Sequence, residues 1–143
     1  MNTEQVILTD TPDAADVAAV REHLSQFNLD ATGIDDQRAL ALLVKDPATG
    51  KVLGGLTGRT SRGVLFVEML FLPDSLRGSG LGSKLLLMAE QEAVRRGCHH
   101  GVLYTNTFQA PGFYKKKGWR ELGEIPSNPP GTSRLFFSKQ LNA

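Results

Sequence analysis

The feature that most constrains the fold is an apolar stretch followed by a glycine-rich loop and an amphipathic helix, at residues 67–97. Residues 65–72 are rich in β-branched and aromatic side chains and too few for a typical helix, so they predict a buried strand, which Pro73 ends. Apolar residues then recur at helical spacing from Leu81 to a stop signal at Gly97. The pattern predicts a strand, a loop and a helix packed against a sheet.

The loop between this strand and this helix has the composition of an anion-binding site. Its sequence, at residues 77–82, is Arg-Gly-Ser-Gly-Leu-Gly. Glycines let backbone N–H groups approach a ligand closely, and the free N–H groups and the dipole at a helix N-terminus favour negative charge. A phosphate group would fit there. Glycine-rich segments also precede helices as plain turns, so the interpretation needs a second feature.

Two nucleotide-binding motifs fail on their spacing. A P-loop has four residues between its glycines and continues with Lys and Ser or Thr, whereas Gly78 and Gly82 enclose three residues and precede Ser83 and Lys84. The dinucleotide fingerprint needs a third glycine at the position of Ser83. An enzyme that acts on nucleotide phosphates is therefore disfavoured.

Two segments together carry a family resemblance. Arg-x-x-Gly-x-Gly after an apolar strand resembles the pyrophosphate-binding motif of the GNAT acetyltransferases, which transfer an acyl group from acyl-coenzyme A to an amine. A second segment, QAPGFYKKKGW at residues 109–119, resembles that family's pattern of a small residue, an apolar residue, Tyr, a charged pair and Gly plus an aromatic. The resemblance covers residue 52 to the C-terminus, and residues 109–112 and 129–131 look like those of small bacterial members. The matching residues are Arg77, Gly80, Gly82, Ala110, Phe113, Tyr114, Gly118 and Trp119.

The resemblance implies the GNAT fold. We expect one α/β (α+β) domain over residues 1–143, with a mixed twisted sheet of about six to seven strands flanked by about four helices. We place a first strand at residues 5–8 and, from the turn cluster at residues 46–50, an antiparallel hairpin. The strands of Glu68 and Thr105 are implied to splay apart and admit the pantetheine arm.

The resemblance also implies how acetyl-coenzyme A, the co-substrate, is held. The loop would bind the pyrophosphate through backbone amides, and the main chain of the preceding strand would pair with pantetheine as an added strand does. Family members often carry Asn where this chain has Thr107, with Asn106 one position earlier. The implied cofactor-binding residues are Leu70, Phe71, Leu72, Arg77, Gly78, Ser79, Gly80, Leu81, Gly82, Asn106, Thr107 and Phe113.

Two side chains are candidates for the proton transfers of amine acetylation. An amine attacks a thioester only when it is unprotonated, so a base is useful, and Glu68, the one charge in its strand, is the candidate, directly or through water. Tyr114 lies in the register of the family's acid and would donate a proton to the departing thiolate. Each has a structural alternative, because Glu68 could form a salt bridge and Tyr114 could pack as a half-buried aromatic.

Charge and cysteine content exclude several other classes. The net charge is +1 with acids and bases interleaved, so the basic footprint of a nucleic-acid binder is missing. The chain has neither an apolar run of about 18 residues nor a signal peptide, so we expect no membrane partner and a cytoplasmic protein. Cys98 is the single cysteine, which rules out an internal disulfide and a cysteine-based zinc cluster, and we expect no metal.

We therefore expect an N-acetyltransferase that moves an acetyl group from acetyl-coenzyme A to a primary amine of a small molecule or peptide, directly in a ternary complex. The alternative is a non-catalytic acyl-coenzyme A binding module or sensor. No motif specifies the acceptor. The sequence leaves open whether the protein is a monomer or a homodimer. One of Lys115, Lys116 and Lys117 could contact a phosphate of coenzyme A.

Overall fold

The computed structural model describes residues 3–142. The chain divides into two compact units, residues 1–35 and 36–143. The first unit contains helix α1 (Ala14–Thr32), which ends at Gly33 in the left-handed conformation, φ 73°. The strand expected at residues 5–8 does not form. The described part of this unit contains no strand, so residues 5–8 have no ladder partner within it.

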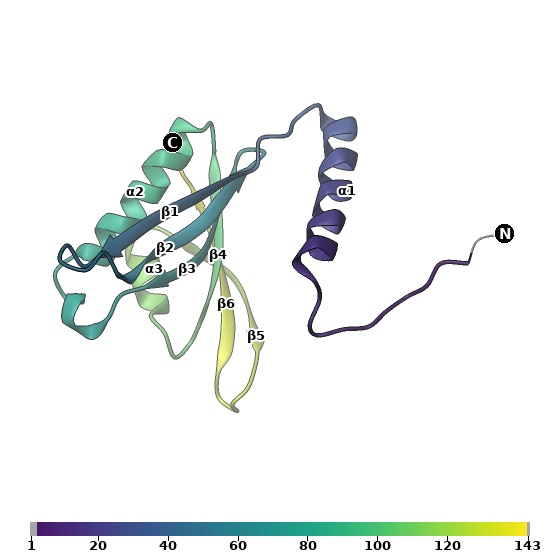
Figure 1. The fold of residues 1–143 in the computed structure, drawn as a ribbon. Coiled ribbons are helices and arrows are strands. Elements are labelled where there is room, and N and C mark those ends of the chain that lie inside the picture. The colour runs from purple at the N-terminus through teal and green to yellow at the C-terminus, as the bar shows by residue number, and fades with distance from the viewer. Residues whose placement is uncertain (1–2, 143) are drawn as a thin grey trace. The chain divides into compact units, whose positions relative to one another are not determined.

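The second unit is a six-stranded mixed sheet with helices packed on it (Figure 1). The expected hairpin and the mixed α/β architecture are confirmed, with six strands and, over residues 3–142, three α-helices instead of about four. The strands lie in the order β1-β2-β3-β4-β6-β5, and only β3 and β4 are parallel neighbours. The elements are β1 (Arg38–Lys45), β2 (Val52–Ser61), β3 (Val64–Phe71), a 3-10 turn (Asp74–Leu76), α2 (Leu81–Arg95), β4 (His100–Asn106), α3 (Pro111–Lys116), β5 (Arg120–Pro126) and β6 (Ser133–Gln140).

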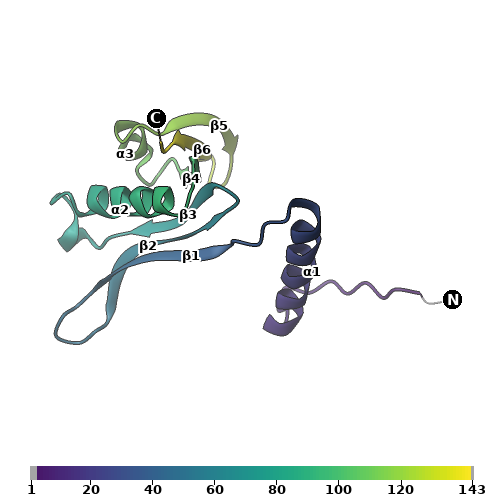
Figure 2. The ribbon, with the colours of Figure 1, turned by 90° about the horizontal axis from the view of Figure 1, so that it is seen from above.

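The core lies between the sheet and α2. Figure 2 shows α2 lying along the face of β1, β2 and β3. Its buried residues Leu85, Leu86, Ala89 and Ala93 recur at helical spacing, as the sequence predicted. Each fully buried leucine contributes about 1.5–3 kcal/mol of transfer free energy. The strand side chains in this core include Leu40, Leu56, Leu65, Val67, Leu103, Leu135 and Phe137.

Strand β3 contains a β-bulge at Glu68. The register with β2 passes from the pair Thr57–Met69 to the pair Gly58–Val67, so Glu68 is the extra residue. The bulge shifts the alternation of the strand by one position. Leu65 and Val67 face the core before the bulge, and Leu70 and Leu72 pack against it afterwards. One face of β3 therefore stays apolar although the chain carries an additional residue.

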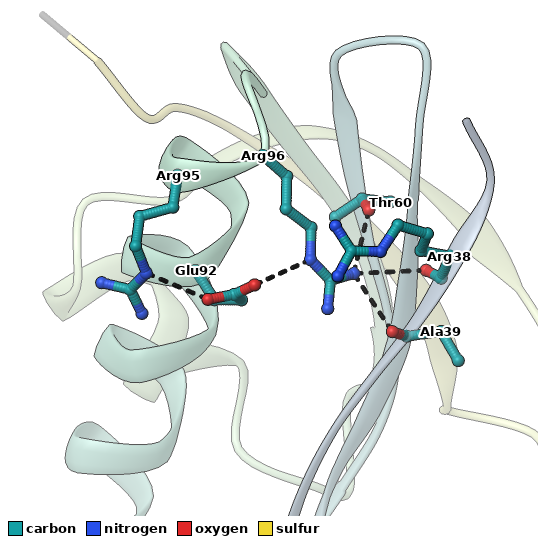
Figure 3. A network of polar contacts seen from close by, with 6 residues as sticks. All are labelled: Arg38, Ala39, Thr60, Glu92, Arg95 and Arg96. Carbon is teal, nitrogen blue, oxygen red and sulfur yellow. Dashed lines mark hydrogen bonds and ion pairs between the residues drawn. The ribbon is translucent and has the colours of Figure 1, made fainter. Parts of the chain in front are cut away.

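Arg96 fixes the C-terminal end of α2 to the first two strands (Figure 3). Its Nη1 donates hydrogen bonds to the carbonyl oxygen of Ala39 at 3.1 Å and to Thr60 Oγ1 at 3.1 Å. Its Nε donates to Glu92 Oε2 at 2.9 Å, and Arg95 Nε lies 3.0 Å from the other oxygen of that carboxylate. Hydrogen bonds from Arg96 and then Arg95 lower the pKa of Glu92. The network orients α2 and hence the loop that precedes it.

Candidate active site

Strands β3 and β4 pair over three residues and then separate. Their parallel ladder ends at the pair Phe66–Val102, although β3 continues to Phe71 and β4 to Asn106. Figure 1 shows the two strands diverging from this point. Beyond it, the edges that face each other have no strand partner within the described residues, so an extended ligand can pair with them as an added strand does. The structure therefore contains the expected splay.

The glycine-rich loop lies between β3 and α2. Gly78 and Gly80 have positive φ angles of 83° and 84°, and a Cβ added to either would meet nothing within 4 Å. Gly80 is the N-cap of α2, so the first-turn N–H groups of the helix have no partner inside the helix. Open backbone and unpaired N–H groups fit a pyrophosphate. Binding at this loop stays a prediction.

Arg77 folds back onto the end of β3. Its Nε donates a hydrogen bond to the carbonyl oxygen of Leu72 at 2.7 Å, and its Nη1 lies 3.0 Å from Asp74 Oδ1. The guanidinium carbon is 5.6 Å from the centre of the Phe71 ring. The Leu72 carbonyl, expected to pair with a ligand main chain, therefore already has a donor.

The two sequence signatures meet at the N-terminal end of α2. A Cβ added to Gly82 would lie 3.7 Å from Leu72 Cδ1 and 3.7 Å from Phe113 Cε1. Gly82 belongs to the first signature and Phe113, on α3, to the second. Pro111 begins α3, where its fixed φ suits a first helical position. Segments about thirty residues apart in sequence thus contact each other, as one ligand site would require.

Tyr114 of α3 lies in an aromatic cluster and is 8% exposed. Its ring centroid is 5.2 Å from that of Phe113, 6.4 Å from that of Trp119 and 5.9 Å from that of Phe137. Burial raises the pKa of Tyr114, so the phenol keeps its proton at neutral pH. The residue is therefore a packing aromatic and also a protonated donor. Its catalytic role stays a prediction.

Glu68 lies on the face of the sheet away from α2. Its Oε1 forms an ion pair with Arg59 Nη1, and 45% of its side chain is exposed. The Arg59 guanidinium carbon lies 4.2 Å from the centre of the Phe66 ring, which alternates with the buried Leu65 and Val67 and so projects from the opposite face. Glu68 follows the core-facing Val67, so the alternation of the strand directs its side chain to this outer face. The salt-bridge alternative is therefore present, and a role as base stays a prediction.

Hydrogen bonds at the end of β4 engage two of the predicted ligand-binding residues. Gln109 Oε1 accepts from Thr105 Oγ1 at 2.9 Å, from the Asn106 backbone N–H at 2.9 Å and from Asn106 Nδ2 at 3.3 Å. Thr107 Oγ1 accepts from the Ser133 N–H at 3.0 Å. Gln109 opens the second signature, but its role as an acceptor for this turn was missed because no local pattern marks it.

A second polar cluster, on the α2 side, was also missed. Glu90 of α2 is 8% exposed and accepts from Lys139 Nζ at 2.7 Å and from Trp119 Nε1 at 3.4 Å. Lys139 Nζ also donates to the carbonyl oxygen of Lys117 at 2.7 Å. The cluster links α2 with β6 and with the end of α3, and thereby fixes the two helices that carry the signatures.

The other candidate groups have local structural partners or form no site. Lys115 Nζ lies 3.3 Å from Glu121 Oε1. Cys98 is 2% exposed, and burial raises the pKa of its thiol, as suits a structural cysteine. Residues 3–142 contain no group of three or more His, Cys, Asp or Glu side chains that could hold a metal ion. No described helix has both the length and the apolar character needed to cross a membrane.

Comparison with known proteins decides the family. The family model of the acetyltransferase (GNAT) family matches residues 7–119. This chain belongs to the GNAT family. An acetyltransferase of Agrobacterium fabrum is 36% identical to this GNAT protein over 135 residues, which cover 94% of this chain and 98% of the relative. The resemblance stated from the two motifs is confirmed.

Two further relatives agree with this assignment. The crystal structure of an acetyltransferase from Agrobacterium tumefaciens superposes on this GNAT protein with a TM-score of 0.87 at 35% identity, covering 96% of this chain and 99% of that one. Blasticidin-S acetyltransferase of Streptomyces morookaense is 40% identical over 93 residues, 64% of this chain and 68% of the relative. The GNAT protein is thus an acyltransferase of the class that uses acetyl-coenzyme A.

Proposed function

We propose that this GNAT protein transfers an acetyl group from acetyl-coenzyme A to the primary amine of a small molecule or peptide, directly and in a ternary complex. The gap between β3 and β4 carries this proposal. It runs through the sheet, with the glycine-rich loop and α3 on the α2 side and Glu68 on the other. Two substrates that enter from the two faces meet in the gap, so no covalent enzyme intermediate is needed.

The chain offers backbone groups that would bind acetyl-coenzyme A, the acetyl donor. The N–H groups of residues 78–82 would hold the pyrophosphate, since the positive φ angles of Gly78 and Gly80 expose them and no side chain fills the space. Leu70, two residues after the bulge residue Glu68, would present its N–H to the thioester carbonyl oxygen, which becomes negative during attack. The donor supplies the acetyl group in activated form, as a thioester.

Glu68 and Tyr114 would move the protons. A lysine-like amine has a pKa near 10.4, so only about one in a thousand or fewer is unprotonated at pH 7, and a base raises that share at the site. The Arg59 ion pair uses Oε1 of Glu68, and Oε2 would take the proton of the amine. Tyr114 Oη, kept protonated by burial, would give its proton to the sulfur that leaves. Positioning of the two substrates supplies most of the rate.

A relative named blasticidin-S acetyltransferase favours a small-molecule acceptor over a protein. Release of free thiol from acetyl-coenzyme A, measured over a panel of primary amines, tests the proposal. Thiol release that depends on an amine, with the acetylated amine found by mass spectrometry, is the expected result. Calorimetric binding of acetyl-coenzyme A without turnover of any amine would instead favour an acyl-coenzyme A binding module.

A further inference from the structure

Glu68 and Tyr104 lie on the two edges of the gap, on the side of the sheet away from α2. The last parallel pair is Phe66–Val102, and each of the two residues lies at the second position after it on its own strand. Alternate residues of a strand share a face. Tyr104 follows the buried Leu103 and is itself 52% exposed, so its ring lies on the same face as the Glu68 carboxylate. The gap therefore has a carboxylate on one edge and an aromatic ring on the other.

Arg134 extends the aromatic edge onto the next strand. Tyr104 pairs with Phe136 of β6, with ring centroids 5.6 Å apart, and the Arg134 guanidinium carbon lies 5.5 Å from the centre of the Tyr104 ring. Arg59, on β2 beside the other edge strand β3, is neutralised by Glu68. Within the described part of the second unit, residues 36–142, Arg134 forms no ion pair with a carboxylate. A cation beside an aromatic face and without a counter-ion suits a planar ligand that carries a negative charge.

We propose that Tyr104 and Arg134 bind the distal end of the acceptor, which is a small primary amine that carries a carboxylate or phosphate beyond a planar part. The inference rests on the proposed acetyl transfer and adds the substrate class. Strand β4 borders the gap and β6 is the next strand, so a strand spacing of about 4.8 Å places the amine and the anion roughly 5–10 Å apart. A free α-amino acid, whose amine and carboxylate share one carbon, is too short to reach both positions.

Two amines that differ only in charge test the proposal. 4-(Aminomethyl)benzoate and 4-(aminomethyl)benzamide have the same ring and the same amine, but only the first is anionic. We expect kcat/KM to favour the benzoate by about tenfold or more, the lower end of what a charge-assisted hydrogen bond provides, and to do so mainly through KM.

Variants of Arg134 and Tyr104 test whether these two residues cause the preference for the benzoate. Arg134→Gln should lower kcat/KM for the benzoate to the level of the benzamide and leave the benzamide unchanged. Arg120→Gln, the same chemical change at an exposed position of β5, is the matched control and should leave both amines unchanged. Tyr104→Ala should lower kcat/KM for both amines, because its ring contacts the part that they share, and Tyr104→Phe should restore both.

Equal kcat/KM for the two amines in the wild type, or a preference that survives Arg134→Gln, would overturn the proposal. Absence of thiol release with every amine would contradict the proposed function instead. In that case calorimetric binding of the same two compounds to the protein saturated with coenzyme A still tests the proposed anion site at Tyr104 and Arg134. An Arg134-dependent preference for the benzoate supports the site, and equal binding of the two compounds rejects it.

Discussion

Glu68 and Tyr114 lie on opposite faces of one sheet, on the two sides of the gap between β3 and β4. Glu68 pairs with Arg59 on the face away from α2, whereas Tyr114 packs against Phe137 in the core on the α2 side. A base on one face and an acid on the other suit a reaction in which the amine and the leaving thiolate occupy opposite sides of the reacting carbon. The two roles are therefore separable by mutation.

Tyr114→Phe should lower turnover by about 10²–10⁴-fold, the range typical of a lost general acid, because the ring still packs while the proton donor is gone. The dissociation constant of coenzyme A, measured by calorimetry, should stay within a few-fold of the wild type. Wild-type turnover in the variant, with the chemical step shown to be rate-limiting, would make Tyr114 a packing residue only.

The pH dependence of turnover should report the proton on Tyr114. A general acid must be protonated, and burial raises its pKa, so kcat should decline only above about pH 10, the ordinary value for tyrosine. The folded protein holds this proton where the unfolded chain releases it, so the free energy of unfolding should also fall as pH rises above about 10. Both effects should be absent in Tyr114→Phe. If turnover or stability of that variant declines equally at alkaline pH, a group other than Tyr114 causes the decline.

Glu68→Gln should lower kcat/KM at neutral pH by about 10²–10⁴-fold, with a smaller loss at higher pH where more of the amine is already unprotonated. Arg59→Met breaks the same ion pair from the other side and should keep most of the rate. Both variants should lose less than about 1 kcal/mol of unfolding free energy, because the pair is exposed. Equal losses of rate in the two variants would show that the ion pair, and not a base, is what matters.

Gly80→Val should abolish the rise in melting temperature that coenzyme A gives the wild type. A side chain at φ 84° strains the backbone by about 1–2 kcal/mol and enters the space assigned to the phosphate. Gly131→Val, at φ 91° in the turn between β5 and β6, introduces similar strain elsewhere and is the control. The control should melt lower than the wild type yet keep the shift with coenzyme A. A Gly80 variant that keeps the shift would move the site away from this loop.

Arg96→Met should lower the free energy of unfolding by about 2 kcal/mol, since it leaves the Thr60 hydroxyl and the Ala39 carbonyl without their donor. Arg95→Met removes the neighbouring guanidinium, which is exposed and pairs with the Glu92 carboxylate, and should cost under about 0.5 kcal/mol. Urea denaturation measures both. Equal effects would mean that the contacts to β1 and β2 contribute little.

The local pattern predicted the elements that carry the signatures. The strand expected at residues 65–72 is β3, Val64–Phe71, and the helix expected from Leu81 is α2. These two predictions succeeded because apolar periodicity, a proline and glycines specify a short segment without reference to the rest of the chain. Helix α1 ends at Thr32 for a similarly local reason, because Gly33 supplies the left-handed residue that ends it.

What the sequence did not predict depends on neighbouring strands. The bulge at Glu68 exists only in register with β2, and the glycines of β2 are needed because other strands approach them. A Cβ added to Gly55 would lie 2.3 Å from the Leu42 carbonyl oxygen, and one added to Gly58 would lie 2.1 Å from that of Phe66. The Glu90–Lys139 contact likewise joins residues far apart in sequence. No single segment contains this information.

The bulge has a consequence for how such a protein can change over evolutionary time. Because Glu68 is the residue in excess of the ladder, deleting it would join Val67 to Met69 and restore regular alternation, with Leu70 still directed into the core. Loss of a single codon could thus remove the candidate base while sparing the packing on which folding depends. A lineage could in this way turn such an enzyme into a folded but inert binder of its former substrates, and the reverse insertion could restore the carboxylate.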